Sequence, residues 1–282
     1  PPTGSLTFGE EAPAVAVGVS SETGGWLREY ARNTDGPAGT ASLSVDASVR
    51  PGTSQNVVGR LGPATEERLL LLAHYDGHDI AEAALDNGCG IATLVTAARI
   101  LAGADLPIGV DVVGVGCEEV GLLGAEHLAS TTDLERIRGV VNVDGAGRFR
   151  DLRALTHTSE TAAAVARAVS TATGRPIPVE ETPHPFSDQW PFLRRGVPSL
   201  QLHSDTDERG RGWGHTHADT RDKVDDRNLR EHGMLAALVV AEFAAPARSP
   251  GRVDSETLAE AFREADFEAG MRAADRWPAE WA

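Results

Sequence analysis

The segment R-L-L-L-L-A-H at residues 68–74 constrains the fold of this 282-residue chain more than any other feature. An unbroken apolar run of this length is typical of a strand buried on both faces, as in parallel sheets covered by helices on both sides. Other strand-length runs follow, with helical periodicity between them. The runs are Asp111–Gly116, Val140–Val143, Ile177–Val179 and Val197–Leu202, and the helices are expected at Asp86–Leu101, Leu122–Ser130, Glu160–Thr171 and Ser187–Arg195. This alternation predicts an α/β fold, a single globular domain with a central mixed, mostly parallel β-sheet flanked by helices on both faces.

The main domain is expected over residues 51–248, after an N-terminal segment over 1–50 and before a C-terminal helical tail over 249–282. Period-two alternation predicts strands at Leu43–Val49 and Asn56–Leu61. The remaining predicted helices are Glu22–Arg32 and Asp226–Ala245. The tail is charged and helix-prone, which favours helices docked on the domain over contact with a partner chain.

The formal net charge of −16 excludes some classes of partner. Nucleic acids and anionic membranes both attract basic patches, so we expect no nucleic-acid partner. No apolar run approaches the ~20 residues of a membrane-spanning helix, so we expect no membrane span. The chain begins at Pro1 without a methionine or a signal-like segment, and we expect the natural N-terminus to have been removed. A soluble protein fits this sequence, whether secreted or cytoplasmic, and no pattern defines its oligomeric state.

Histidine and acidic residues recur where a predicted strand ends or a predicted helix begins. In open α/β sheets such loops meet at one edge, where ligands bind. The residues are His74, Asp86, Glu118, Glu119, Asp144 and His215. Imidazole nitrogens combined with carboxylate oxygens suit zinc, and a carboxylate can bridge two ions ~3.5–4 Å apart. The adjacent glutamates allow one to bind metal while the other acts as a general base toward water.

Each acidic residue also has an ordinary structural explanation. Asp86 in D-N-G fits a helix cap, and the Glu118-Glu119 pair fits a helix N-terminus, where the dipole favours acids. Asp144 fits a terminal turn. Five such coincidences at strand ends and helix starts are harder to explain than one metal site, which we therefore favour.

The chain has nine histidines, and the candidate metal ligands must be distinguished from the others. Asp76, two residues after His74, can accept the second N–H of that imidazole and orient the ring. By chemistry alone, His217 is as good a ligand as His215. The remaining histidines are expected to be surface or satisfied core residues: His78, His127, His157, His184, His203 and His232.

Together these motifs resemble the co-catalytic di-zinc aminopeptidase family, the bacterial leucine-aminopeptidase type of the clan MH zinc exopeptidases. The resemblance runs from about Asn56 to about Phe243. The matching segments are His74-Tyr75-Asp76, Asp86-Asn87-Gly88, Glu118-Glu119-Val120-Gly121-Leu122-Leu123-Gly124, Asn142-Val143-Asp144, Phe186-Ser187-Asp188, Pro191-Phe192, Gly196-Val197-Pro198 and His215-Thr216 with Asp219-Thr220.

The resemblance implies two zinc ions per chain. It assigns one ion to His74 and Asp144 and the other to Glu119 and His215, with Asp86 bridging them. These assignments give each ion an imidazole and a carboxylate of its own.

The resemblance also implies catalytic roles. Glu118 would be the general base, and Asp76 would orient the first zinc-binding histidine. The family's last ligand histidine precedes a threonine and lies four residues before an aspartate, which selects His215 over His217. A cis peptide bond often follows the bridging aspartate, which makes Asp86-Asn87 the candidate here.

Two departures from the family pattern affect substrate preference. The family commonly has a tyrosine before the last histidine, where this chain has Gly214. The substrate-side segment often reads Ser-Asp-His, where this chain has Ser187-Asp188-Gln189. Residues 12–32 also resemble the end of a protease-associated insert, which predicts further chain upstream.

The implied function is that of a metalloprotease, an aminopeptidase that hydrolyses N-terminal residues of peptides with a zinc-activated water. The departures leave open a carboxypeptidase or an amide deacylase that acts on a small or specialised substrate. Cyclisation of N-terminal glutamine on the same fold is disfavoured, because those relatives usually use one zinc. An inactive peptidase-fold binding protein is disfavoured too, because such relatives lose ligands.

Overall fold

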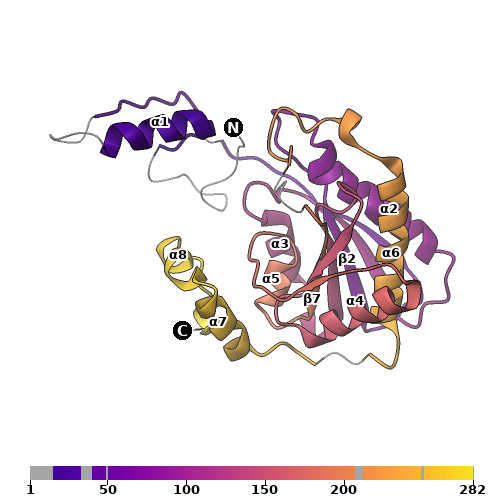
Figure 1. Cartoon of the computed structure of the whole chain (residues 1–282). Coiled ribbons are helices and arrows are strands. Elements are labelled where there is room, and N and C mark those ends of the chain that lie inside the picture. The colour runs from indigo at the N-terminus through magenta and orange to yellow at the C-terminus, as the bar shows by residue number, and fades with distance from the viewer. Residues whose placement is uncertain (1–14, 33–39, 49, 207–211, 249–250, 282) are drawn as a thin grey trace.

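The computed structural model describes residues 15–32, 40–48, 50–206, 212–248 and 251–281. Within these ranges seven strands form one mixed sheet in the order β1-β3-β2-β4-β7-β5-β6 (Figure 1). Their bounds are β1 Val57–Leu61, β2 Arg68–His74, β3 Gly109–Val115, β4 Ile137–Val143, β5 Leu152–Leu155, β6 Val179–Glu180 and β7 Ser199–Ser204. Strands β3, β2, β4 and β7 run parallel, whereas β1 and β5 run antiparallel to β3 and β7. The predicted mixed, mostly parallel sheet is confirmed.

Helices cover both faces of this sheet. Helices α2, α4 and α6 contribute to the core on one face, and α3 and α5 to the core on the other (Figure 1). The helices are α1 Ser21–Arg32, α2 Cys89–Leu101, α3 Leu123–Thr131, α4 Glu160–Thr173, α5 Trp190–Leu193, α6 Asp226–Ala244, α7 Ser255–Glu264 and α8 Phe267–Ala273. Short helical turns are η1 Ala84–Gly88, η2 Leu134–Arg136, η4 Arg221–Lys223 and η5 Ala279–Trp281.

Strand β2 shows why both faces need a cover. Successive side chains of a strand point to opposite faces. Leu69 and Leu71 enter the core with α2, α4 and α6, and Leu70 and Leu72 enter the core with α3 and α5. All four leucines are at most 2% exposed. The strand has no polar face, as its sequence predicts.

We expect Leu71→Ala to lower the free energy of unfolding by about 2–5 kcal/mol, because it leaves a cavity in a closed core. Leu238→Ala is the matched control, since Leu238 is 45% exposed on α6. Surface changes of that kind usually stay within about 0.5 kcal/mol. Urea unfolding followed by fluorescence measures both variants, and equal losses would contradict the burial of Leu71.

Local polar contacts fix where the main helices begin and end. Ser159 accepts the N–H of Ala162 at the start of α4, and Asp225 accepts the N–H of Arg227 at the start of α6. Gly174, with φ of 65°, follows the last residue of α4, where the left-handed backbone suits glycine. These caps explain why both helices match their predicted ranges closely.

Several elements differ from the sequence prediction, including the bounds of α2, β6 and β7. Residues 43–48 of the expected strand Leu43–Val49 are irregular, and Val49 lies outside the described residues. Leu43 and Val45 are each 49% exposed, so the alternation buries nothing and pairs with no strand of the described sheet. Strand β5 was missed because its four residues include a charged Arg153. Helix α5 is shorter than predicted.

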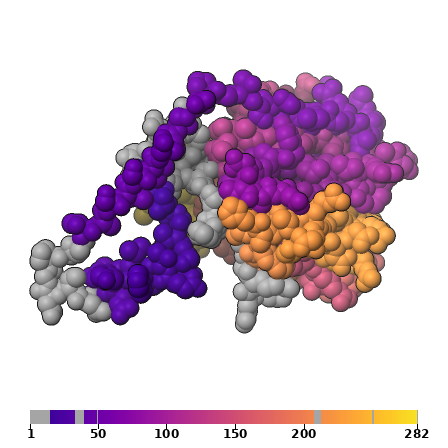
Figure 2. Space-filling model, turned by 90° about the horizontal axis from the view of Figure 1, so that it is seen from above, coloured from indigo at the N-terminus to yellow at the C-terminus, as the bar shows by residue number. Residues whose placement is uncertain are grey.

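The two ends of the chain differ in packing. Helix α1 has no buried residue, and Figure 2 shows it beside the main body. Helices α7 and α8 pack on α5 through an apolar group that we call the tail cluster. It comprises Leu122, Trp190, Leu193, Leu258, Ala259, Phe262, Met271 and Trp281. The ring centroid of Trp190 lies 4.9 Å from that of Phe262 and 5.5 Å from that of Trp281. Among the described helices, none has the length and apolar character to cross a membrane.

Candidate metal centre

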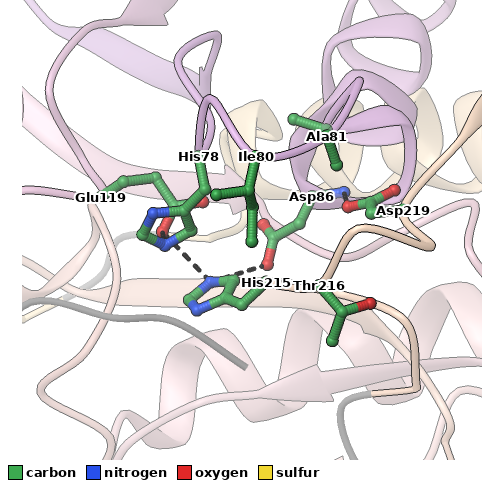
Figure 3. Close-up of a pocket in the computed structure, with 9 residues that line it drawn as sticks. His78, Ile80, Ala81, Asp86, Glu119, His215, Thr216 and Asp219 are labelled. Atoms are coloured by element: carbon green, nitrogen blue, oxygen red, sulfur yellow. Dashed lines mark hydrogen bonds and ion pairs between the residues drawn. The ribbon is translucent and has the colours of Figure 1, made fainter. Parts of the chain in front are cut away.

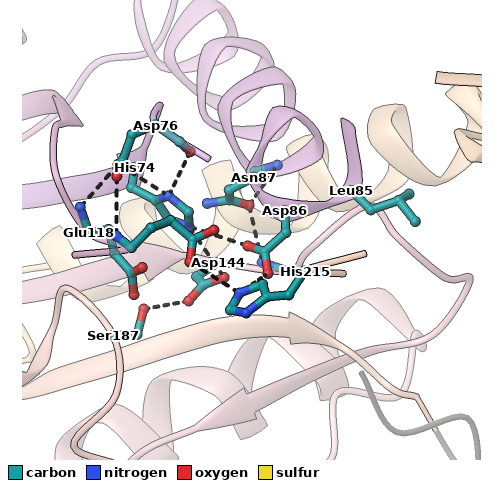
Figure 4. Close-up of polar contacts among 12 residues, drawn as sticks. His74, Asp76, Leu85, Asp86, Asn87, Glu118, Asp144, Ser187 and His215 are labelled. Atoms are coloured by element: carbon teal, nitrogen blue, oxygen red, sulfur yellow. Dashed lines mark hydrogen bonds and ion pairs between the residues drawn. The ribbon is translucent and has the colours of Figure 1, made fainter. Parts of the chain in front are cut away.

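Three parallel strands end at one edge of the sheet, and each brings a candidate ligand there (Figure 4). His74 is the last residue of β2, and Asp144 directly follows β4. Glu118 and Glu119 lie in the loop between β3 and α3. Because β3, β2 and β4 are neighbours in that order, their loops meet, which is where α/β sheets bind ligands.

Asp86 lies in η1, the turn that leads into α2. The carboxylate of Asp219 accepts the N–H of Leu85 at 2.6 Å and of Asp86 at 3.0 Å. Asn87 donates from its side-chain amide to the carbonyl of Val143 at 2.9 Å, which ties the turn to β4. The Asp86-Asn87 peptide bond is cis, as the family resemblance implied. These contacts aim the Asp86 carboxylate at the sheet edge.

The two carboxylate oxygens of Asp86 face different histidines. Oδ1 lies 3.4 Å from Nε2 of His74, and Oδ2 lies 3.2 Å from Nε2 of His215. On the first side, Oδ1 of Asp144 is 3.8 Å from the same His74 nitrogen. On the second side, Oε2 of Glu119 is 3.1 Å from Nε2 of His215. The donor atoms thus form two groups that share Asp86.

The donor atoms fit zinc in both chemistry and spacing. In a tetrahedral site with bonds of about 2.0–2.2 Å, neighbouring ligand atoms lie about 3.3–3.6 Å apart. The imidazole–carboxylate distances here, 3.1 to 3.8 Å, bracket that spacing. Neutral imidazole with carboxylate is also a donor set that zinc accepts.

Asp76 connects the loops after β2 and β3. Its carboxylate accepts the N–H groups of Glu118 and Glu119, both at 3.1 Å, and its Oδ1 lies 3.5 Å from Nδ1 of His74. The backbone carbonyl of Asp76 is also 3.2 Å from that ring nitrogen. With Nδ1 so occupied, Nε2 of His74 is left facing the carboxylates.

Three consecutive residues of the predicted substrate-side segment, Ser187, Asp188 and Gln189, are buried beside the candidate ligands. Ser187 donates its hydroxyl to Oδ2 of Asp144 at 2.5 Å. The side-chain oxygen of Gln189 accepts from Asn142 at 2.9 Å, and its nitrogen lies 3.2 Å from Nε2 of His157. Both Ser187 and Gln189 are fully buried. The departure from the family pattern at Gln189 therefore belongs to an interior hydrogen-bond network.

Arg148 partly offsets the negative charge of the centre. Its guanidinium Nη2 is 2.8 Å from Oδ1 of Asp86, and its Nε donates to the carbonyl of Leu85 at 2.8 Å. Burial by itself raises the pKa of Asp86, but Arg148, His215 and His74 hold it well below its usual value. Asp86 is therefore ionised, as a metal ligand must be.

Glu118 has the opposite electrostatic environment. Burial raises the pKa of Glu118 well above its ordinary value, against the attraction of His74, and nearby Asp144 and Asp188 raise it further. A carboxyl group in surroundings of this kind is a candidate for taking up and returning a proton.

A pocket opens beside the second group of donors (Figure 3). It is lined by His78, Ile80, Ala81, Ala83, Asp86, Glu119, His215, Thr216 and Asp219. His78, expected from the sequence to be a surface or satisfied core residue, lies here with its Nε2 2.9 Å from Oε2 of Glu119. In the sequence, the feature that could have drawn attention to His78 is its position four residues after His74. Arg148 lies four residues after Asp144, and the sequence analysis did not single it out either.

These features define a mostly parallel α/β sheet with a cluster of carboxylates and histidines at the carboxyl ends of its strands, a candidate metal centre. The chain belongs to peptidase family M28, whose sequence model matches residues 56–240. Aminopeptidase YwaD of Bacillus subtilis (strain 168) is 25% identical over 267 residues, covering 90% of this chain and 56% of that protein.

Solved structures show the same fold. BSAP, a zinc aminopeptidase from Bacillus subtilis, matches with a TM-score of 0.62 at 24% identity, over 69% of this chain and 52% of that one. The aminopeptidase from Aneurinibacillus sp. strain AM-1 matches with 0.59 at 23% identity, over 71% and 50%. The chain spans about half the length of these relatives.

Proposed function

We propose that this chain is a zinc-dependent aminopeptidase that removes N-terminal residues from peptides and uses two zinc ions. The observation that carries the proposal is the placement of Asp86, whose two oxygens face two separate groups of donors. Family membership supports a peptidase, and the names of its relatives support an aminopeptidase and zinc.

In this proposal each ion has its own ligands. His74 and Asp144 would hold one ion, Glu119 and His215 would hold the other, and Asp86 would contribute to both. When bound, the zinc ions would polarise the scissile carbonyl and lower the pKa of a water molecule from 15.7 toward about 7.

The chain's own residues then move the proton and hold the ligands. Glu118, buried at the junction of the loops, takes a proton from the water and returns it to the leaving amine. Asp76 holds the ring of His74, and Ser187 holds the carboxylate of Asp144. Asp219 keeps Asp86 in its turn. These three residues position others and do not touch substrate in the proposal.

Metal content and cleavage of a leucine anilide test the proposal together. We expect close to two zinc ions per dialysed chain, loss of cleavage on chelation, and recovery when zinc returns. Zinc without anilide cleavage would contradict the aminopeptidase, and a panel of C-terminal peptides and N-acyl amines would then test for a carboxypeptidase or deacylase. No bound zinc would contradict the metal centre itself.

A further inference from the structure

His78 lies in the loop between His74 and Asp86, and its surroundings are those of a metal ligand. Its Nε2 is 2.9 Å from Oε2 of Glu119, the same oxygen that lies 3.1 Å from Nε2 of His215. The two imidazole rings are 4.3 Å apart at their centroids and inclined at 70° (Figure 3). Two imidazole nitrogens therefore converge on one carboxylate oxygen.

We propose that His78 is an additional ligand of the ion held by Glu119 and His215, an inference that rests on the two-zinc function proposed above. One nitrogen or oxygen each from His78, Glu119 and His215 lie within 4.8 Å of one another, so one ion can contact all three. With Oδ2 of Asp86 at 3.2 Å from His215, this ion would have four protein ligands.

The loop that carries His78 is held in place from both sides. A Cβ at Gly77 would lie 2.2 Å from Cβ of Ala83, so the loop packs directly against the turn that contains Asp86. On the other side, the carbonyl of Ile80 is 2.9 Å from Nδ1 of His217, in the segment that supplies His215. The side chain of His78 is only 16% exposed. A ligand role suits a side chain confined in this way.

A fourth protein ligand would give the two ions different numbers of protein ligands. Zinc sites with four protein ligands are typically structural, whereas catalytic sites keep a position open. The group of His74, Asp86 and Asp144 supplies three protein ligands and so keeps a position for substrate or water. The ion at His78 would accordingly bind more tightly and survive partial chelation.

Zinc affinity measured by competition with a chromophoric chelator tests this inference on the full chain. Wild-type protein should bind two ions, one of them much more tightly. We expect His78→Ala and His78→Gln each to weaken the tighter site at least about tenfold, a loss that even mutation of supporting residues causes. Glutamine can still donate to Glu119 from the position of Nε2 but is a poor zinc ligand. His127→Ala, an exposed histidine on α3, should change neither site.

The outcomes separate this inference from the proposed function. Two ions in the wild type, with both His78 variants unchanged, would overturn the ligand role alone. The ligand role would also be overturned if His78→Gln bound zinc normally while His78→Ala bound it more weakly. A hydrogen bond to Glu119 would then be enough to account for the contribution of His78 to zinc affinity. A wild type that binds no zinc would overturn both. Cobalt-substituted protein gives an independent readout, since loss of an imidazole ligand should change its visible absorption.

Discussion

Glu118→Gln is expected to retain both zinc ions and to lose about 10²–10⁴-fold in kcat, the usual contribution of a general base. Glutamine matches the shape of glutamate but cannot accept a proton. Glu118 is only 9% exposed, so no solvent group can easily replace it. Because the proposed ligand sets do not include Glu118, zinc content should stay the same while turnover falls.

The measurement combines zinc per chain with steady-state kinetics on a leucine anilide. Glu66→Gln is the matched control, because Glu66 is exposed just before β2, at the opposite edge of the sheet. Turnover in Glu118→Gln close to that of Glu66→Gln would reject the base assignment. Loss of zinc would instead make Glu118 a ligand, as one of the geometric donor groups, His74 with Glu118 and Glu119, allows.

Asp86→Asn is expected to reduce activity to the level of metal-free protein and zinc to one ion or fewer per chain. Arg148 donates to Oδ1 of Asp86, so the amide oxygen should take that place and the amide nitrogen should face His215. An amide nitrogen has no lone pair available for zinc. Both donor groups also lose the negative charge that they share.

Zinc analysis and thermal unfolding of Asp86→Asn separate a metal effect from a folding effect. Arg148 keeps a hydrogen-bond acceptor, so the variant should fold, whereas breaking a buried pair outright typically costs about 3–5 kcal/mol. Asp105→Asn provides the control, since Asp105 is exposed in the loop before β3. Two ions and normal cleavage in Asp86→Asn would rule out the bridging role.

The sequence predicted those parts of the fold in which the order of apolar and polar residues directly reflects which side chains are buried. The run at β2 has apolar residues for both faces, and its predicted range, Arg68–His74, matches the observed strand. Residues 43–48 alternate clearly but pair with no strand in the part of the chain that the structure describes, and alternation does not show whether a neighbour exists. Pairing is a property of the whole sheet, which explains this error.

In the candidate site, too, some residues could be found from the sequence and others could not. Residues at strand ends, such as His74 and Asp144, could be found because each follows an apolar run. His78 and Arg148 follow no such run, and their importance depends on how loops from different strands meet. Gln189 appeared relevant to substrate because of its place in a motif, yet its side chain is fully buried and contacts the buried side chains of Asn142 and His157.

The tail cluster contains residues that lie beyond the part of the chain matched by the family model. The family match stops at residue 240, but Phe262 and Trp281 cover Trp190 on α5. Just before Trp190 lies Ser187, which holds the carboxylate of Asp144. A chain shortened to the region matched by the family model would therefore expose an aromatic surface close to Asp144, a candidate metal ligand. The C-terminal residues belong in any fragment meant to test metal binding.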